Sequence, residues 1–310
     1  MSWLLRRIAI SVLLVLVVAT IVFLAIHLVP GDPAELLLSQ GGVAPDPAAV
    51  DELRNQLGLN RPILAQYADG MLRLARGDLG RSLQDDSSVA QEIARRLPRT
   101  LELVGAAVLL SVVIGVPAGT FAAARRAGAF DRIASVVSGL ALAVPVFVLG
   151  TLFVLVFAQR LHWTTAGGYV PLAQNPVQHL VLLAMPALTI AVGLSAVVYR
   201  MTRTAVLDVA ARDFVRTARA KGLTPGRILV RHTLRNALLP VVTVVALHLG
   251  SLLGGTVLVE YVFNWPGLSG LLVSAVTARD YPEVVGIILV ISVLFVDILY
   301  AVLDPRVRSQ

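Results

Sequence analysis

Long stretches without a charged residue constrain this chain more than any other feature. Crossing the roughly 30 Å hydrocarbon core of a bilayer takes about 20 helical residues. Six stretches of that order recur along the 310 residues, with Asp297 the one charge inside them. We therefore expect an all-α, polytopic membrane protein with six transmembrane helices. They are Ile8–Val29, Leu103–Ala124, Ile133–Gln159, Leu180–Tyr199, Asn236–Val259 and Val284–Leu303.

The composition argues against several other classes. Hydrophobic residues make up 57% of the chain and charged residues 15%, where soluble domains carry about 25% charge. The net charge of +7 comes from arginines that flank apolar runs, a distribution unlike the basic surface patch of a nucleic-acid partner. The chain has no cysteine, its histidines lack metal-ligand spacing, and neither a HExxH nor a GxSxG motif occurs. We expect no enzyme and no metal site.

The arginines beside short loops predict the orientation. Cytoplasmic loops carry an excess of basic residues, whereas the short loops of the opposite face hold only Arg160 and Arg279. The first apolar stretch is longer than the roughly 7 to 15 residues of a signal-peptide core, so we expect it to be retained as an anchor. Both termini are then cytoplasmic. The cytoplasmic basic residues lie at 6–7, 125–132, 200–235 and 306–308.

Residues 30–99 form the longest connection between apolar stretches. Glycine and proline punctuation predicts short helices there over Pro47–Leu57, Pro62–Ala75 and Val89–Leu97. This topology makes 30–99 an extracytoplasmic helical insertion. The predicted organisation is thus residues 1–29 for the N-terminal end and first helix, 30–99 for the insertion, and 100–310 for a core of five transmembrane helices with a cytoplasmic loop at 201–235.

The cytoplasmic loop 201–235 has the pattern of a helix, a sharp turn and a second helix. Gly222 is suited to a left-handed cap that ends the first helix, and Thr224 with Pro225 are typical of the start of the next. Basic side chains beside an apolar face suit either a helix on anionic lipid or a helix docked in a protein groove. Leu207, Ala211, Phe214 and Ala218 are predicted to share the apolar face, and Arg212, Arg216 and Arg219 the basic one.

The motifs of this loop resemble the coupling loop of ABC importer permeases. "DFVRTARAKGL" at 213–223 and "RHTLRNALLP" at 231–240 are similar to the family's Glu-Ala-Ala signature ahead of a fixed glycine. Gly222 matches the glycine and Ala218 the second alanine. Arg216 and Thr217 depart from the consensus Glu and Ala, a departure typical of the dipeptide and oligopeptide branch. "HLVPGDP", "QLGLNRPILAQY", "GDLGRSL", "RLPRTLEL", "VPVFVLG", "VEYVFNWPGL", "ARDYP" and "LYAVLDPRVR" extend the resemblance over the chain.

The resemblance implies a fold, partners and a mechanism. The fold is that of a type I ABC importer permease in a bacterial cytoplasmic membrane. The partners are a homologous second permease, two ATP-binding cassette subunits that hold ATP and Mg²⁺, an extracytoplasmic solute-binding protein and membrane lipid. This chain itself needs no cofactor. The implied ATPase-coupling residues are Phe214, Arg216, Thr217, Ala218, Arg219, Lys221, Gly222 and Leu223, with Gly222 setting the bend and Ala218 permitting close approach.

The resemblance favours peptides as cargo, with nickel chelates or glutathione as alternatives. An ion-coupled secondary transporter is the competing class, since His248 and Asp297 lie within apolar stretches. Ionisable groups inside a membrane are often functional. We take His248 and Asp297 as candidates for the translocation pathway. A secondary transporter, however, usually carries several such groups and broken helices in corresponding halves.

Overall fold

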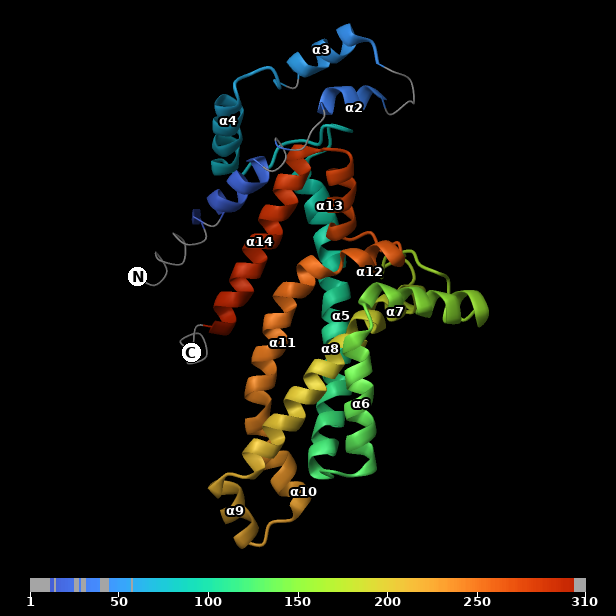
Figure 1. Ribbon diagram of the computed structural model, residues 1–310, viewed down its shortest axis with the longest axis vertical. Coiled ribbons are helices and arrows are strands. Elements are labelled where there is room, and N and C mark those ends of the chain that lie inside the picture. The colour runs from blue at the N-terminus through green and yellow to red at the C-terminus, as the bar shows by residue number, and fades with distance from the viewer. Residues whose placement is uncertain are drawn as a thin grey trace. The chain divides into compact units, whose positions relative to one another are not determined.

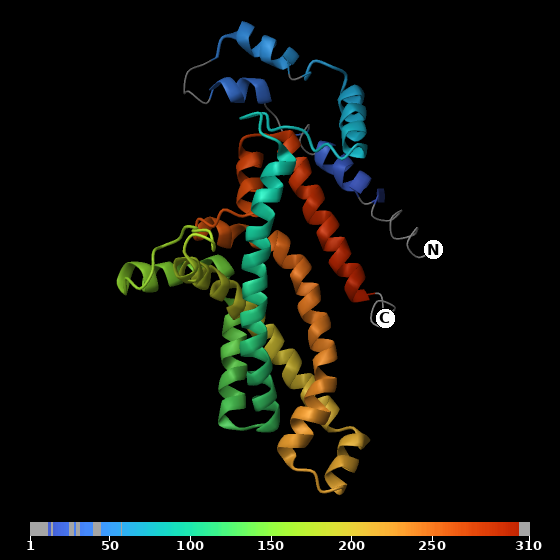
Figure 2. The ribbon, with the colours of Figure 1, turned by 180° about the vertical axis from the view of Figure 1, so that it is seen from behind.

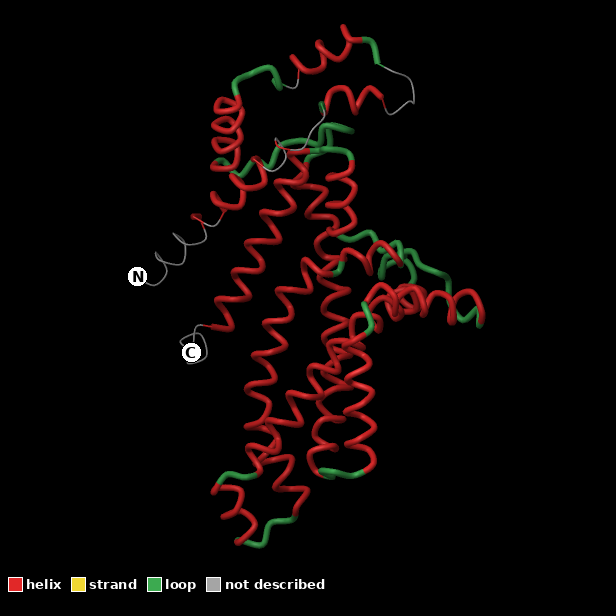
Figure 3. Tube along the Cα trace, in the orientation of Figure 1, coloured by secondary structure: helices red, strands yellow, loops and turns green. Residues whose placement is uncertain are grey.

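The computed structural model describes residues 12–13, 15–24, 28, 32–39, 45–56 and 58–303. Over these ranges the chain is helical and has no β-strand (Figure 3). The expected all-α class is confirmed. The chain divides into two compact units, and Figures 1 and 2 show their helices from opposite sides. Unit 1 comprises residues 1–99 with 267–297, and unit 2 comprises 100–266 with 298–310. The predicted domain boundaries remain predictions.

Unit 1 is built from short helices and the amino-terminal part of a long one. Two of the predicted helix ends are confirmed, because left-handed glycines follow them: Gly58 has φ +68° and Gly77 φ +76°. The start of the first predicted span lies outside the described residues. The helices are Val15–Leu24, α2 (Pro33–Ser39), α3 (Pro47–Gln56), α4 (Ile63–Ala75), residues 89–99 of α5 (Val89–Ala124), α13 (Leu268–Thr277) and most of α14 (Tyr281–Leu303).

The core of unit 1 keeps α5 helical through a proline. The prediction that a helix ends at Leu97 is wrong, since α5 continues past Pro98 to Ala124. A proline inside a helix costs about 3 kcal/mol, and burying an aliphatic side chain contributes about 1.5 to 3 kcal/mol. Val89 and Ile93, both buried on the turns before Pro98, offset that cost. The buried core is Val89, Ile93, Leu268, Leu271 and Ile287.

Asp280 joins the start of α14 to an extended segment of the insertion. Its side chain is fully buried. One carboxylate oxygen accepts a hydrogen bond from the backbone N–H of Glu283 at 3.3 Å, which caps the helix. The other accepts from the Ser82 hydroxyl and from the backbone N–H of Leu83, the latter at 2.9 Å. One buried carboxylate thus holds two distant parts of the sequence together.

Helix α8 (Pro176–Ala210) is the central element of unit 2. It packs against α6 (Ala129–Ala143), α7 (Val146–Phe153) and α11 (Arg235–Gly255). Its apolar window is 61% buried, against 28% for α5 and for Pro225–Leu252. Helix α8 therefore has protein neighbours on most sides, whereas the others leave broad apolar faces to lipid or to a partner.

Two glycines allow α5 to cross α8 closely. A Cβ on Gly115 would lie 2.8 Å from the Val198 side chain, and one on Gly119 would lie 2.6 Å from the Tyr199 carbonyl oxygen. Gly115 and Gly119 are four residues apart, the spacing that brings transmembrane helices into backbone contact. Any side chain at Gly119 would push the two helices apart.

The third predicted span is not one straight helix, contrary to expectation. Helix α6 and the stretch Val146–Arg160, which is α7 followed by the π-helix η1 (Val154–Arg160), meet at an angle of 100°. Pro145 follows Val144, whose ψ of 122° is extended. Because a proline disfavours the helical conformation of the residue before it, the bend lies where the sequence breaks the hydrogen-bond ladder. Figure 1 shows α7 turned away from α6.

The other spans differ from expectation mainly at their ends. Within the described ranges, α5, α8 and Pro225–Leu252 are long and apolar enough to cross a membrane, and the bent pair makes up to four. Val15–Leu24 and Tyr281–Val296 are shorter apolar helices. The predicted fifth span is interrupted, because α11 ends at Gly255 and α12 (Val257–Val262) follows. The predicted number of six spans is therefore not reached by this measure.

Candidate functional site

The loop 201–235 folds as the predicted helix, turn and helix. Helix α9 (Asp213–Ala220) is followed by the one-turn α10 (Pro225–Arg227) and the π-helix η2 (Ile228–Leu234). We call residues 213–234 the hairpin. Thr224 takes the extended cap conformation and Pro225 stands in the first turn, as predicted. The side chain of Thr224 makes no capping hydrogen bond, so the backbone alone starts this helix.

Gly222 ends α9 in a specific geometry. Its φ is +77°. The backbone N–H of Gly222 donates to the Arg219 carbonyl at 2.9 Å, and that of Leu223 donates to the Ala218 carbonyl at 3.3 Å. This pair of bonds is the Schellman arrangement, which satisfies two carbonyls that a helix end otherwise leaves open. Gly222 sets the bend in the way the sequence predicts.

The inner face of the hairpin differs from the predicted apolar face. Val215 and Ala218 are buried with Ile228, and Leu223 packs against them. Phe214 is instead 42% exposed. The predicted register carried one helix from Leu207 to Ala218, but α8 ends at Ala210 and α9 begins at Asp213, so the break rotates the second helix. Within this chain Ala218 permits close approach of the following π-helix.

The outer face of α9 presents the remaining predicted coupling residues to the surroundings. Arg216, Thr217, Arg219 and Lys221 are exposed beside Phe214. Arg216 lies 3.4 Å from Asp213, an exposed pair that contributes less than about 1 kcal/mol. The hairpin therefore combines a packed inside with a basic outside that carries one exposed aromatic ring.

A part-buried ion pair anchors the carboxyl-terminal part of α8, and the sequence did not predict it. Arg203 donates from Nε to Asp131 at 2.6 Å and from a terminal nitrogen at 2.8 Å. The backbone N–H of Ala127 also donates to Asp131, at 2.9 Å. Asp131 is 4% exposed. Arg203 entered the sequence argument only as a cytoplasmic charge, because nothing in its spacing relates it to an acid 72 positions earlier.

His248 and Asp297 belong to different compact units. His248 lines a mainly apolar cavity of about 240 Å³ in unit 2, between α8, α11 and the bend at Val144. Its ring makes no hydrogen bond to a described residue. Asp297 falls on α14, and its side chain lies outside the described part of the chain. The pathway assignment of both residues remains a prediction.

Comparison with known proteins accounts for the whole chain. The model of the binding-protein-dependent transport system inner membrane component family matches residues 115–309, and the model of that family's N-terminal part matches residues 1–104. The chain belongs to this family. It is a multi-pass inner membrane permease of a binding-protein-dependent transport system.

Curated relatives match this permease over nearly its full length. A putative peptide permease of Brucella suis biovar 1 is 39% identical over 98% of both chains. The di/tripeptide transport system permease DppB of Pseudomonas aeruginosa is 38% identical over 100% of this chain and 99% of its own. The glutathione transport system permease GsiC of Escherichia coli K12 is 39% identical over 95% and 94%.

A solved structure shows the same fold. In an inward-facing structure of the MetNI methionine ABC transporter, one chain matches this permease with a TM-score of 0.56. The match covers 71% of this chain and 96% of that chain at 21% identity. The expected importer-permease fold is confirmed. At 21% identity the match shows the fold alone and says nothing about the transported solute.

Proposed function

We propose that this chain is one of two homologous permeases in an ATP-driven importer of peptides. The observation that carries the proposal is the full-length similarity to relatives named for peptide and di/tripeptide transport. The complex would add two ATP-binding cassette subunits in the cytoplasm and an extracytoplasmic solute-binding protein. Both termini of the permease would be cytoplasmic, as the arginine distribution indicates.

The hairpin is the proposed site of ATPase coupling. Its exposed residues, Phe214 together with Arg216, Arg219 and Lys221, suit a cleft that offers both an apolar contact and acidic groups. The packed inner face makes α9 and η2 move together, because Val215, Ala218 and Ile228 share one core. Closure of the ATPases on ATP would then shift the hairpin as a body and favour one of the two permease states.

Charge reversal tests the coupling. The double variant Arg219→Glu, Lys221→Glu should insert normally, lose the co-purifying ATPases and lose ATP-dependent uptake of a labelled dipeptide. Arg73→Glu, on an exposed face of the insertion, is the matched control and should retain the ATPases. Uptake that continues from a proton gradient, with no ATPase attached, would favour the ion-coupled alternative.

Glutathione is the second cargo candidate, because GsiC is as similar to this chain as the peptide permeases are. Nickel chelates are the third cargo candidate. Competition against labelled dipeptide uptake by reconstituted complex discriminates among them. We expect unlabelled dipeptides to compete, and glutathione or a nickel chelate to compete only if the peptide assignment is wrong.

A further inference from the structure

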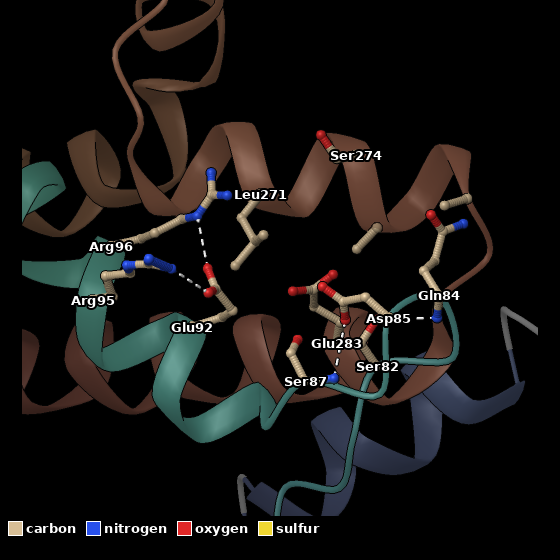
Figure 4. A pocket seen from close by; sticks show the side chains of 12 residues that line it. Ser82, Gln84, Asp85, Ser87, Glu92, Arg95, Arg96, Leu271, Ser274 and Glu283 are labelled. Atoms are coloured by element: carbon tan, nitrogen blue, oxygen red, sulfur yellow. Dashed lines mark hydrogen bonds and ion pairs between the residues drawn. The ribbon is translucent and has the colours of Figure 1, made fainter. Parts of the chain in front are cut away.

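Unit 1 contains a polar cavity whose lining the transport mechanism does not use. Its volume is about 220 Å³, and its lining comes from the segment 82–96, from α13 and from Glu283 at the start of α14 (Figure 4). Ser82 and Glu283 are buried at its base, whereas Asp85 and Arg95 are exposed at its rim. The cavity is thus open to solvent and has a buried carboxylate at its base.

The charges around this cavity do not balance. Three carboxylates, Asp85, Glu92 and Glu283, face two guanidiniums, Arg95 and Arg96. Both arginines bind the same acid: Arg95 lies 2.8 Å and Arg96 3.3 Å from Glu92 (Figure 4). The remaining negative charge belongs to Glu283 and Asp85.

Glu283 is the buried carboxylate in the lining of this cavity. Its residue is 8% exposed, and its carboxylate has no hydrogen bond or ion pair with any described residue. Burial, together with repulsion from Asp280, Asp85 and Glu92 and opposed by Arg96, raises the pKa of Glu283 to about 7. A buried carboxylate normally has partners, since burying it alone costs several kcal/mol. An arriving cation would supply the missing one.

We propose that this cavity receives an organic cationic group, an ammonium or a guanidinium, that pairs with Glu283 and Asp85. A metal ion suits the site less well, because no group of three or more His, Cys, Asp or Glu side chains in the described ranges has metal-binding geometry. The cation has two possible sources. One is a lysine or arginine of the extracytoplasmic binding protein, which rests on the proposed function. The other is a free small amine.

The test uses the complete complex in lipid nanodiscs and Nα-acetyl-lysine methylamide as the probe. Calorimetry at pH 8 should detect binding, and the Nε-acetylated analogue, which has no charge, should not bind. Affinity should fall tenfold or more at pH 5, because two pH units below a pKa of about 7 only about 1% of Glu283 is ionised. Glu283→Gln should lose the binding, and Glu52→Gln, on the exposed face of α3, should retain it.

A measurement of binding-protein docking distinguishes the two sources of the cation. If the cation is a side chain of the binding protein, Glu283→Gln should weaken docking of that protein by tenfold or more while Glu52→Gln does not. If docking is unchanged and the probe still requires Glu283, the source is a free amine. Equal binding of the charged and neutral probes, or probe binding that survives Glu283→Gln, overturns the proposal. So does an absence of probe binding together with unchanged docking. ATP-driven peptide uptake measured on the same samples tests the proposed function independently.

Discussion

Replacing Gly222 with alanine isolates the energetic contribution of one backbone angle. A Cβ at Gly222 would meet no atom within 4 Å, so the substitution introduces no clash. The φ of +77° remains, and an L-residue pays about 1 to 2 kcal/mol to adopt the left-handed region. That penalty lowers the stability of the Schellman turn alone and corresponds to an opening of the hairpin that is about 5-fold to 30-fold more frequent.

Gly226→Ala is the matched control within the same hairpin. Gly226 also has open space around its Cβ position, but it lies in α10 and is not among the positive-φ glycines. Alanine there should stabilise the turn by up to about 1 kcal/mol. The two variants therefore add the same methyl group, but Gly222→Ala should lower the stability of the turn and Gly226→Ala should raise it.

Hydrogen exchange of the reconstituted complex measures the effect. In Gly222→Ala, amides 218–223 should exchange about 5-fold to 30-fold faster than in the wild type, and ATPase stimulation by docked binding protein should fall. In Gly226→Ala exchange should be unchanged or slower. Equal acceleration in both variants, or none in either, would refute the argument that the angle at Gly222 holds the hairpin.

Three further predictions concern unit 1 and the α8 contacts. Gly119→Leu should separate α5 from α8 and lower the melting temperature of the purified protein, whereas Gly105→Leu, with nothing within 4 Å of its Cβ position, should leave it near the wild-type value. Asp131→Asn should cost about 2 to 3 kcal/mol by removing the charged partner of Arg203, as read from a denaturant titration in which the exposed Asp213→Asn changes little. Stability should fall as the pH rises from about 4.5 to about 7. Folded Glu283 holds its proton to a higher pH than the unfolded chain does. The free energy of unfolding should therefore fall by at most about 3 kcal/mol over this range, and melting curves of Glu283→Gln should lack this slope.

The sequence predicted those features that depend on local chemistry. The length of an apolar stretch indicates a membrane segment, because the bilayer thickness sets that length. Helices end at Gly58, Gly77 and Gly222, because glycine readily adopts a left-handed backbone. The extended backbone at Thr224 and the first-turn position of Pro225 likewise follow without tertiary information. The hairpin was therefore found in the right place with the right shape.

Features that depend on packing were missed. The apolar face of α9 was misassigned because one helical period was carried across the break at residues 211–212, and a break of two residues rotates everything after it. Pro98 was taken as a helix end because its cost is local, whereas the burial of Val89 and Ile93 that offsets it is not. Pro145 shows the reverse: the sequence predicts one span over Ile133–Gln159, and the structure bends it by 100° at Pro145.

Polar contacts between distant segments could not be predicted from the sequence either. Asp131 and Arg203 are 72 residues apart, and Ser82 and Asp280 are 198 apart. No spacing rule relates such residues, because only the fold brings them within bonding distance. Glu283 went unnoticed for the same reason: its burial depends on the segment 82–96, which is remote in sequence.

The length of α8 has a mechanical consequence. At 1.5 Å per residue, the part from Arg200 to Ala210 continues the rod for about 16 Å beyond the predicted span, more than the roughly 5 to 8 Å depth of one headgroup layer. If the span ends at Tyr199 as predicted and α8 runs along the membrane normal, the hairpin lies clear of the phosphates, which disfavours the lipid-surface alternative. Pro186 is the only proline inside α8, and it precedes the cavity-lining residues Thr189 to Val197. Under the proposed coupling, a movement of the hairpin would reach the cavity through a part of α8 that contains no proline.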